Sequence, residues 1–351
     1  MRKRSVSLSN LIVPLLALLL IVVFNIIRDP SFFAVKLLLN NDGNHVLSGN
    51  LISILNGASE LAVLAMGMTL VTAASGGQDI SVGAAAAIAG SVFVKILRGG
   101  DVDLPLILVA FLTCCVVTML FGAFNGTLVS VFKIQPMIAT LILFTAGRSI
   151  AYWVNGGATP TVSGEWLGYL GGFIPGISVP TPIFIVMICG VLFWLLLKFT
   201  NLRLYTQALG INEKSTRLNG INTTWIKMLS FIILAVCVAI AGAIRVCRLG
   251  LINHETILLD IEMDAILAVA IGGNALGGGK FSMVGSVIGA YIIQALTTTL
   301  YAMKVPSNAV KSYKALVIIA LVVIGSPIVK RYAALLRDKL FKGNPKKAEG
   351  V

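Results

Sequence analysis

The chain has 351 residues, of which 57% are hydrophobic and only 12% charged, and its mean hydropathy is +0.95. Soluble domains carry about 25% charged residues, so this composition excludes an ordinary soluble protein and favours a lipid-embedded one. The net charge of +13 is also typical of nucleic-acid-binding proteins. The basic residues cluster at the ends of apolar segments, however, so membrane topology explains them better and no nucleic-acid partner is expected.

Long apolar segments recur along the chain, and segments of about 20 apolar residues can cross a bilayer as helices. We predict an all-α fold, a polytopic membrane protein with about ten transmembrane helices. The first segment also fits a signal peptide, but no small-residue cleavage site follows Ile27, which favours an uncleaved span. The predicted spans are residues 10–27, 51–74, 80–97, 104–131, 136–154, 181–199, 225–249, 263–278, 283–303 and 312–330.

The distribution of basic residues predicts the orientation of these spans, because lysine and arginine accumulate on the cytoplasmic side. If ten spans alternate from a cytoplasmic N-terminus, both termini and the polar segment 200–227 face the cytoplasm, and these regions hold most of the basic residues. Arg245 and Arg248, at the outer end of the seventh span, count against this topology.

Two polar, glycine-rich breaks interrupt the apolar sequence, at 75–83 (SGGQDISVG) and 272–280 (GGNALGGGK). Backbone that leaves a helix at membrane depth must be buried in protein or line a wet cavity, and paired broken helices point to a transport path. We therefore expect broken or re-entrant segments here. The candidate path residues are Gly76, Gly77, Gln78, Asp79, Ser81, Asn125, Gln135, Arg148, Gly272, Gly273 and Asn274.

Each of these polar residues also has a structural interpretation. Asp79 fits the N-cap of the third span, with Ser81 supporting it, and this interpretation is favoured. Arg148 either faces the protein interior or water, or extends to the interface. Helix capping and interhelical hydrogen bonds explain Asn125 and Gln135 at least as well as contact with a polyhydroxylated solute.

Three acidic residues, Asp260, Glu262 and Asp264, precede the eighth span. They suggest a cation site or an outer helix start, where the helix dipole stabilises anions. The sequence near them offers no further oxygen ligands, which favours the helix start.

Two predicted outer loops, residues 28–50 and 155–180, are longer than plain connectors, and long loops are often functional. They are either flexible turns or a docking surface for an external partner. The five cysteines lie mostly in apolar runs without C-x-x-C spacing, so we interpret them as small apolar residues.

The polar segment 200–227 is expected to be bound by a soluble partner. A short helix should begin near Asn212 and end at Gly220, because asparagine caps helix N-termini and glycine follows C-termini. Glu213 and Arg217 are charges that can pair with such a partner and steer its docking.

No enzyme signature is present: the chain lacks GxxxxGK[ST], HExxH and GxSxG. We predict a non-catalytic transport protein that neither binds nor hydrolyses ATP by itself. An ion-coupled secondary transporter is the alternative, with Asp79 as its one good intramembrane ion site, and an intramembrane enzyme is a third possibility without a catalytic constellation.

Four motifs follow one another along the chain: LAVLAMGMTLVTAASGGQDISVGAAAAIAGSV, GAFNGTLVSVFKIQPMIATLILFTAGRSIA, ALGINEKSTRLNGINTTWIKML and DAILAVAIGGNALGGGKFSMVGSVIGA. In this order they resemble the permeases of bacterial ABC sugar importers, which include ribose, xylose, galactose, galactofuranose and autoinducer-2 permeases. The resemblance covers about residues 51–324, and KIQPMIATLILFTAGRSIA and VPTPIFIV are most similar to the galactofuranose type. The chain departs from the common pattern at Gln78 and at Asn274-Ala275.

The resemblance implies a single transmembrane permease domain over 1–351, in a bacterial inner membrane, that moves a monosaccharide by alternating access. The implied partners are a second permease protomer in a homodimer or heterodimer, cytoplasmic ABC ATPases that carry the ATP and Mg, and an extracytoplasmic sugar-binding protein. The segment 200–227 would then be the ATPase-docking loop and 331–351 a cytoplasmic tail. The implied coupling residues are Asn212, Glu213, Lys214, Ser215, Thr216, Arg217, Leu218, Asn219 and Gly220.

Overall fold

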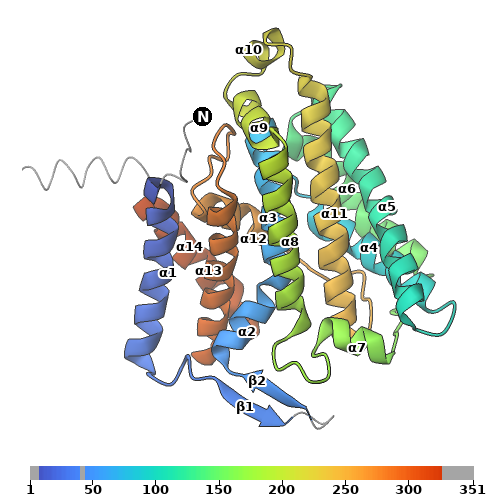
Figure 1. Ribbon diagram of the computed structural model, residues 1–351, viewed down its shortest axis with the longest axis vertical. Coiled ribbons are helices and arrows are strands. Elements are labelled where there is room, and N and C mark those ends of the chain that lie inside the picture. The colour runs from blue at the N-terminus through green and yellow to red at the C-terminus, as the bar shows by residue number, and fades with distance from the viewer. Residues whose placement is uncertain (1–7, 40–43, 326–351) are drawn as a thin grey trace, which may run out of the picture. The chain divides into compact units, whose positions relative to one another are not determined.

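The computed structural model describes residues 8–39 and 44–325, and in that part the chain is almost entirely helical (Figure 1). This confirms the all-α fold class, with one short antiparallel hairpin added. The elements in chain order are α1 (Leu8–Arg28), β1 (Lys36–Leu39), β2 (His45–Ser48), α2 (Asn50–Gly57), α3 (Ser59–Ser75), α4 (Val82–Leu97), α5 (Leu104–Ser130), α6 (Pro136–Val154), α7 (Glu165–Gly171), α8 (Thr181–Phe199), α9 (Leu202–Ile211), α10 (Glu213–Leu218), α11 (Thr223–Leu249), α12 (Ile261–Ile271), α13 (Met283–Ala302) and α14 (Ser307–Gly325).

The chain divides into two compact units, residues 1–299 and 300–351. The first unit holds nearly all of the helices and both glycine-rich breaks. The second holds α14 and the last turn of α13, and Lys304 takes a left-handed conformation between these two helices. The predicted cytoplasmic tail, 331–351, lies outside the described residues.

A helix is present within each of the ten predicted spans, but their lengths differ. Among the described residues, α5, α6, α8, α11 and α13 are each long and apolar enough to cross a membrane. The pair α2 and α3, bent by 40° at the break between them, is long and apolar enough only when both helices are taken together, as a broken span or a re-entrant loop. The helix α4 is a shorter apolar helix, and α12 has only 11 residues. The short helices are therefore α4, which follows the first break, and α12, which precedes the second.

Helix α3 lies at the centre of the first unit, where nearly all of its residues are buried. Helix α11 packs against α3, α4 and α5, and 61% of its apolar window is buried, compared with 22% for α8. The outer helices expose large apolar side chains. Such side chains suit contact with lipid, because a surface that faces water would carry more polar residues. These include Leu112, Leu120, Met187, Ile188 and Leu192.

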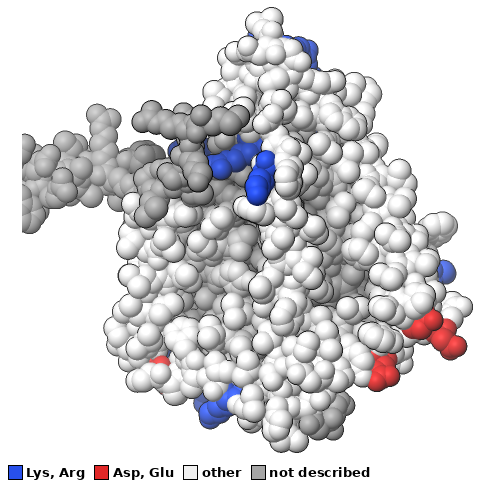
Figure 2. Space-filling view, in the orientation of Figure 1, with Lys and Arg blue, Asp and Glu red and all other residues white. Residues whose placement is uncertain are grey.

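The two ends of the first unit carry different elements (Figure 1). Helices α9 and α10 lie at one end, which we call the α10 end, and α1 begins there. The β1–β2 hairpin and α7, formed by the two long predicted outer loops, lie at the other end, which we call the hairpin end. In Figure 2 basic side chains are visible below the tip of the α10 end and also at the hairpin end, whereas the acidic side chains visible in that view lie toward the hairpin end.

A buried ion-pair group explains the two arginines that contradict the positive-inside distribution. The Glu60 carboxylate, on α3, is fully buried and lies 3.2 Å from Nε of Arg245 and 3.1 Å from Nη1 of Arg248, both on α11. Arg248 also donates from Nη2 to the backbone and side-chain oxygens of Asn56, each at 2.9 Å. Both arginines therefore serve helix packing, and they say little about orientation.

All five cysteines lie in the described part of the chain, where each is buried and unpaired. This confirms their interpretation as small apolar residues in helix interfaces.

Candidate functional site

The first break begins where α3 ends. Gly76 takes a left-handed conformation, φ 65°, and its N–H bonds back to the carbonyl of Thr72, so glycine closes the helix without a steric penalty. Gly77 follows against the ring of Pro136, the first residue of α6, and a Cβ on Gly77 would come within 2.8 Å of that ring. The chain then re-enters helix at Val82, the start of α4.

Asp79 anchors a buried polar cluster in this break. Its Oδ1 accepts hydrogen bonds from the backbone N–H of Ser81 at 2.8 Å and from the Ser81 hydroxyl at 2.6 Å. Asn125 of α5 donates to the Ser81 hydroxyl at 3.0 Å and to Asp79 at 3.5 Å. The N-cap of α4 is Ser81 and not Asp79, because the carboxylate closes a turn two residues earlier. The capping interpretation of Asp79 was therefore wrong in detail.

The cavity beside this cluster is small. It measures about 10 Å³ and is enclosed by side chains of α4, α5, α6 and α11 as well as Asp79 and Ser81. A cavity of this volume holds about one water molecule. The cluster is thus closed to a sugar-sized solute from inside this chain.

The second break ties α12 to α13. A Cβ on Gly272 would meet the backbone of Gly285 and Ser286 at 2.5 Å, so only glycine allows this approach. Asn274 then uses both ends of its amide: Oδ1 accepts from the N–H of Ser282 at 2.6 Å, and Nδ2 donates to the Ser286 hydroxyl at 2.8 Å. The Ser286 hydroxyl in turn accepts from Thr69 of α3 at 2.6 Å.

The two breaks meet in space. The Gln78 amide donates to the carbonyl of Leu276 at 2.8 Å, and the N–H of Gly279 donates to the carbonyl of Ala73 at 3.2 Å. The first break therefore lies directly against the second, although they are 198 residues apart at the Gln78 bond. Gly273, with φ 84°, provides the turn that brings the second loop to this contact.

Helix α9 packs on the place where the breaks meet. A Cβ on Gly210 would collide with the carbonyl oxygen of Ala73 and with the N–H of Gly279, one atom from each side of the contact. These are backbone atoms, so they cannot move aside as a flexible side chain would. Glycine at this position lets the polar segment 200–227 touch the last turn of α3, which leads into the first break, and the second break at once.

Two of the predicted path residues have other surroundings. Arg148 donates from Nη1 to the carbonyls of His254, Glu255 and Ile257 at 2.8, 3.1 and 3.2 Å, which fixes α6 to the loop 250–260. Such bonds to backbone carbonyls satisfy a guanidinium inside a membrane protein. Gln135 is exposed, immediately before α6.

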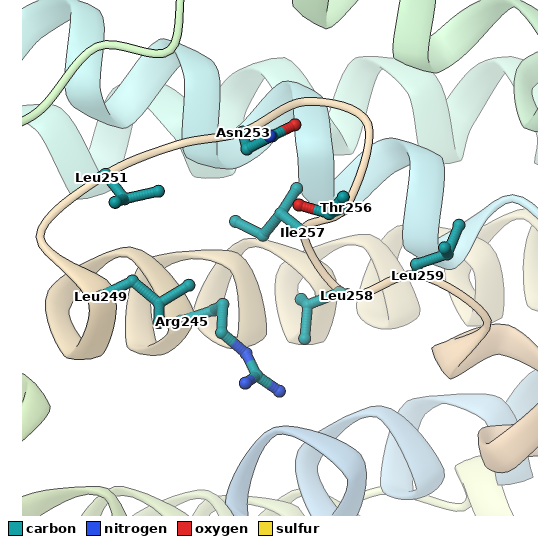
Figure 3. A pocket seen from close by; sticks show the side chains of 8 residues that line it. All are labelled: Arg245, Leu249, Leu251, Asn253, Thr256, Ile257, Leu258 and Leu259. Atoms are coloured by element: carbon teal, nitrogen blue, oxygen red, sulfur yellow. The ribbon is translucent and has the colours of Figure 1, made fainter. Parts of the chain in front are cut away.

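A larger cavity lies near the hairpin end, where sequence reasoning placed no site. It has a volume of about 220 Å³ and is lined by the end of α11 and the loop after it, including Arg245, Asn253 and Thr256. Figure 3 shows the loop arching back along α11, with the Arg245 guanidinium pointing away from the helix. The position of Arg245 at the outer end of a span was the one signal in the sequence.

The predicted helix in the polar segment is present. Asn212 caps α10 by accepting a hydrogen bond from the N–H of Ser215 at 3.0 Å, and Gly220, with φ 77°, follows its end. Thr216 is the buried residue of α10. The other residues named for coupling are intermediate or exposed, and Leu218 is 88% exposed at the helix tip.

Glu213 differs from the exposed side chains around it. Its Oε1 accepts from Lys133 at 2.7 Å and its Oε2 from Lys227 at 2.6 Å, and Arg217 lies 3.7 Å from Oε1. Burial acts to raise the pKa of Glu213, but the hydrogen bonds and charges of both lysines outweigh it and lower the pKa to about 2. From the sequence we expected Glu213 to pair with a soluble partner. In the structure both of its carboxylate oxygens instead accept hydrogen bonds from lysines of the same chain.

The comparisons with known proteins identify the family. Residues 50–325 match the family model described as the permease component of the branched-chain amino acid transport system. The chain belongs to this family. The family match covers both breaks, α9 and α10.

Three proteins named for sugar transport are among the curated relatives similar to this permease. The galactofuranose transporter permease protein YtfT of Escherichia coli (strain K12) is 38% identical over 92% of this chain and 91% of its own length. The fructose import permease protein FruF of Bifidobacterium longum is 34% identical over 94% and 92%. The ribose import permease protein RbsC of Escherichia coli (strain K12) is 35% identical over 88% and 92%. No solved structure matches this permease.

The resemblance drawn from the four motifs is confirmed by these matches. The chain is a multi-pass inner-membrane permease of an ABC importer, which works with ATPase and substrate-binding partners. It is a non-catalytic transport component, and the relatives support this class and not the ion-coupled alternative.

Proposed function

We propose that this permease imports a monosaccharide, galactofuranose or another pentose or hexose, by alternating access. The relatives named above support the solute class, because three of them are named for sugars. The observation that carries the mechanism is the contact between the two breaks beneath α9, because it brings irregular membrane backbone within reach of the polar segment.

We infer that the solute passes between this chain and a second permease protomer, in a homodimer or a heterodimer. The cavity beside Asp79 has room for about one water molecule, so the interior of one protomer is closed at the first break. The cavity near Arg245, at about 220 Å³, is smaller than the roughly 300–1,000 Å³ of drug-sized pockets and suits a small polar solute. Its polar lining is the amide of Asn253 and the hydroxyl of Thr256, whereas the Arg245 guanidinium is paired with Glu60.

The α10 end is proposed to face the cytoplasm and to receive the ABC ATPase, which carries the ATP and Mg. Leu218 and Ile211 are 88% and 76% exposed on either side of the short charged helix. Large apolar side chains at the tip of a polar segment are typical anchors for a groove on a partner. The distribution of basic residues along the sequence supports the proposal that both termini lie in the cytoplasm, and the hairpin end is proposed to face the sugar-binding protein.

Topology is tested by the variant Lys214→Cys, because Lys214 is exposed on α10 whereas all five native cysteines are buried. We expect an impermeant thiol reagent to label this cysteine in inside-out vesicles and not in intact cells. The unmodified chain, with its buried cysteines, is the control. Labelling in intact cells would place α10 outside and contradict the orientation.

The role of the breaks is tested by Gly77→Leu and Gly273→Leu. A side chain at 77 would push against Pro136, and at 273 it would strain a backbone with φ 84°. We expect uptake to fall at least tenfold while membrane insertion persists. The matched control is Gly190→Leu in α8, where a Cβ meets nothing within 4 Å. Normal uptake in both break variants would remove the breaks from the mechanism.

The solute class is tested by reconstitution. The permease, its ATPase and its binding protein are placed in liposomes, and sugar uptake and ATP hydrolysis are measured with a panel of pentoses and hexoses. We expect one or a few monosaccharides to stimulate both activities, and the permease alone to hydrolyse no ATP. Uptake driven by an ion gradient without ATP would overturn the proposal.

A further inference from the structure

The Glu213 carboxylate connects three separate elements of the chain. It is the first residue of α10, Lys133 lies in the loop between α5 and α6, and Lys227 lies in the first turns of α11. Lys227 is only 7% exposed, so its ammonium group depends on Glu213 for charge compensation. Lys133 holds a left-handed backbone, φ 58°, that residues other than glycine rarely adopt.

Each of these connections continues toward the breaks. Lys133 lies three residues before Pro136, whose ring is the nearest neighbour of Gly77 in the first break. Lys227 lies in the first turns of α11, which packs along α3, α4 and α5. On the other side of Asn212, Gly210 of α9 touches Gly279 in the second break. A displacement of α10 therefore reaches both breaks through short, packed contacts.

Glu213 is poorly suited to pair with a partner directly. Its two oxygens already accept hydrogen bonds at 2.7 and 2.6 Å, and the side chain is 29% exposed. The exposed residues of α10 are Lys214, Ser215, Arg217 and Leu218. The helix thus has an outer face available for docking and one inward carboxylate that fixes it to the membrane helices.

We propose that Glu213 is the positioning residue that makes α10 move as one body with α11 and the α5–α6 loop, and so transmits ATPase motion to both breaks. This inference rests on the proposed docking of the ATPase at the α10 end. Its physical basis is that two charge-assisted hydrogen bonds, one to a nearly buried lysine, resist displacement of the helix relative to its supports.

The test is Glu213→Gln, which keeps the shape of the side chain and removes its charge. In the reconstituted importer we expect the sugar transported per ATP hydrolysed to fall at least tenfold, while ATPase association and hydrolysis stay within twofold of the wild type. Loss of fold lowers uptake and hydrolysis together, so this ratio separates a positioning role from a merely structural one. Lys198→Gln, which removes an exposed charge in the last turn of α8, outside the segment 200–227, is the control and should keep the ratio unchanged.

A second variant keeps the inference testable if Glu213→Gln does not accumulate. Lys133→Met removes one of the two hydrogen-bond donors at an exposed site, and we expect the same loss of coupling in smaller degree. Normal sugar transport per ATP in either variant would overturn the inference. Loss of ATPase pull-down by Glu213→Gln would overturn it too, because Glu213 would then be a docking charge.

Leu218→Glu tests the underlying proposal separately: if this variant leaves ATPase pull-down intact, docking of the ATPase at the α10 end is wrong.

Discussion

Replacing Glu60 by alanine is expected to remove most of the folded permease. Glu60 is fully buried and is the carboxylate that faces both Arg245 and Arg248. Removing one partner of a buried ion pair costs roughly 3–5 kcal/mol, because the remaining charge stays buried without compensation. Here Arg245 and Arg248 would both lose their carboxylate, and Arg248 would keep its two hydrogen bonds to Asn56. The measurement is the thermal unfolding midpoint and the monodisperse yield of the purified protein in detergent.

Two further variants sharpen this prediction. Glu255→Ala removes an exposed acid from the loop after α11 and should change stability by no more than about 0.5 kcal/mol. Glu60→Met combined with Arg248→Met removes the carboxylate together with its more buried arginine, and should recover part of the loss since buried ion pairs can be replaced by apolar groups. An unfolding midpoint of Glu60→Ala equal to that of Glu255→Ala would contradict the role of this ion-pair group.

Replacing Gly210 by alanine is expected to abolish uptake. The added methyl group collides with the carbonyl of Ala73 and the N–H of Gly279, so α9 must withdraw from both breaks. Overpacking of this kind costs typically about 1–3 kcal/mol, which a folded permease can survive. We expect the variant to insert into the membrane and to lose uptake at least tenfold, measured as labelled sugar accumulated by reconstituted vesicles.

The matched control is Gly190→Ala, a glycine in the middle of α8 whose Cβ position faces open space. It makes the same chemical change where the added carbon meets nothing within 4 Å, so uptake should stay within twofold of the wild type. If Gly210→Ala transports at the level of Gly190→Ala, the contact between α9 and the breaks has no part in transport.

Features that depend on neighbouring residues could be predicted from the sequence. Asn212 and Gly220 delimit α10 because capping and left-handed turns are properties of a few adjacent residues. The breaks at 75–83 and 272–280 were likewise visible, since glycines and polar residues interrupt apolar runs there. The family could be identified for the same reason, because its four motifs are continuous stretches of chain.

Features that depend on pairs of residues far apart in the chain could not be predicted from the sequence. Asp264 and Glu262 were expected at an outer helix start, and they do lie in the first turn of α12, but Glu262 is buried with its carboxylate against Gly83 of α4. Nothing local distinguishes a carboxylate that faces water from one that faces another helix. Arg248 seemed to contradict the topology until Glu60, 188 residues away, was found beside it.

What the sequence alone determined about this protein is its class: a polytopic helical permease with two breaks and one short capped helix in a polar segment. Composition, hydropathy and capping are local, so they can be read along the chain. Only the tertiary structure decided that the breaks meet through Gln78 and Leu276, and that Glu213 pairs with Lys133 and Lys227 inside the chain. Such pairings are chosen by helix packing, because buried polar groups must find partners wherever the folded chain brings them.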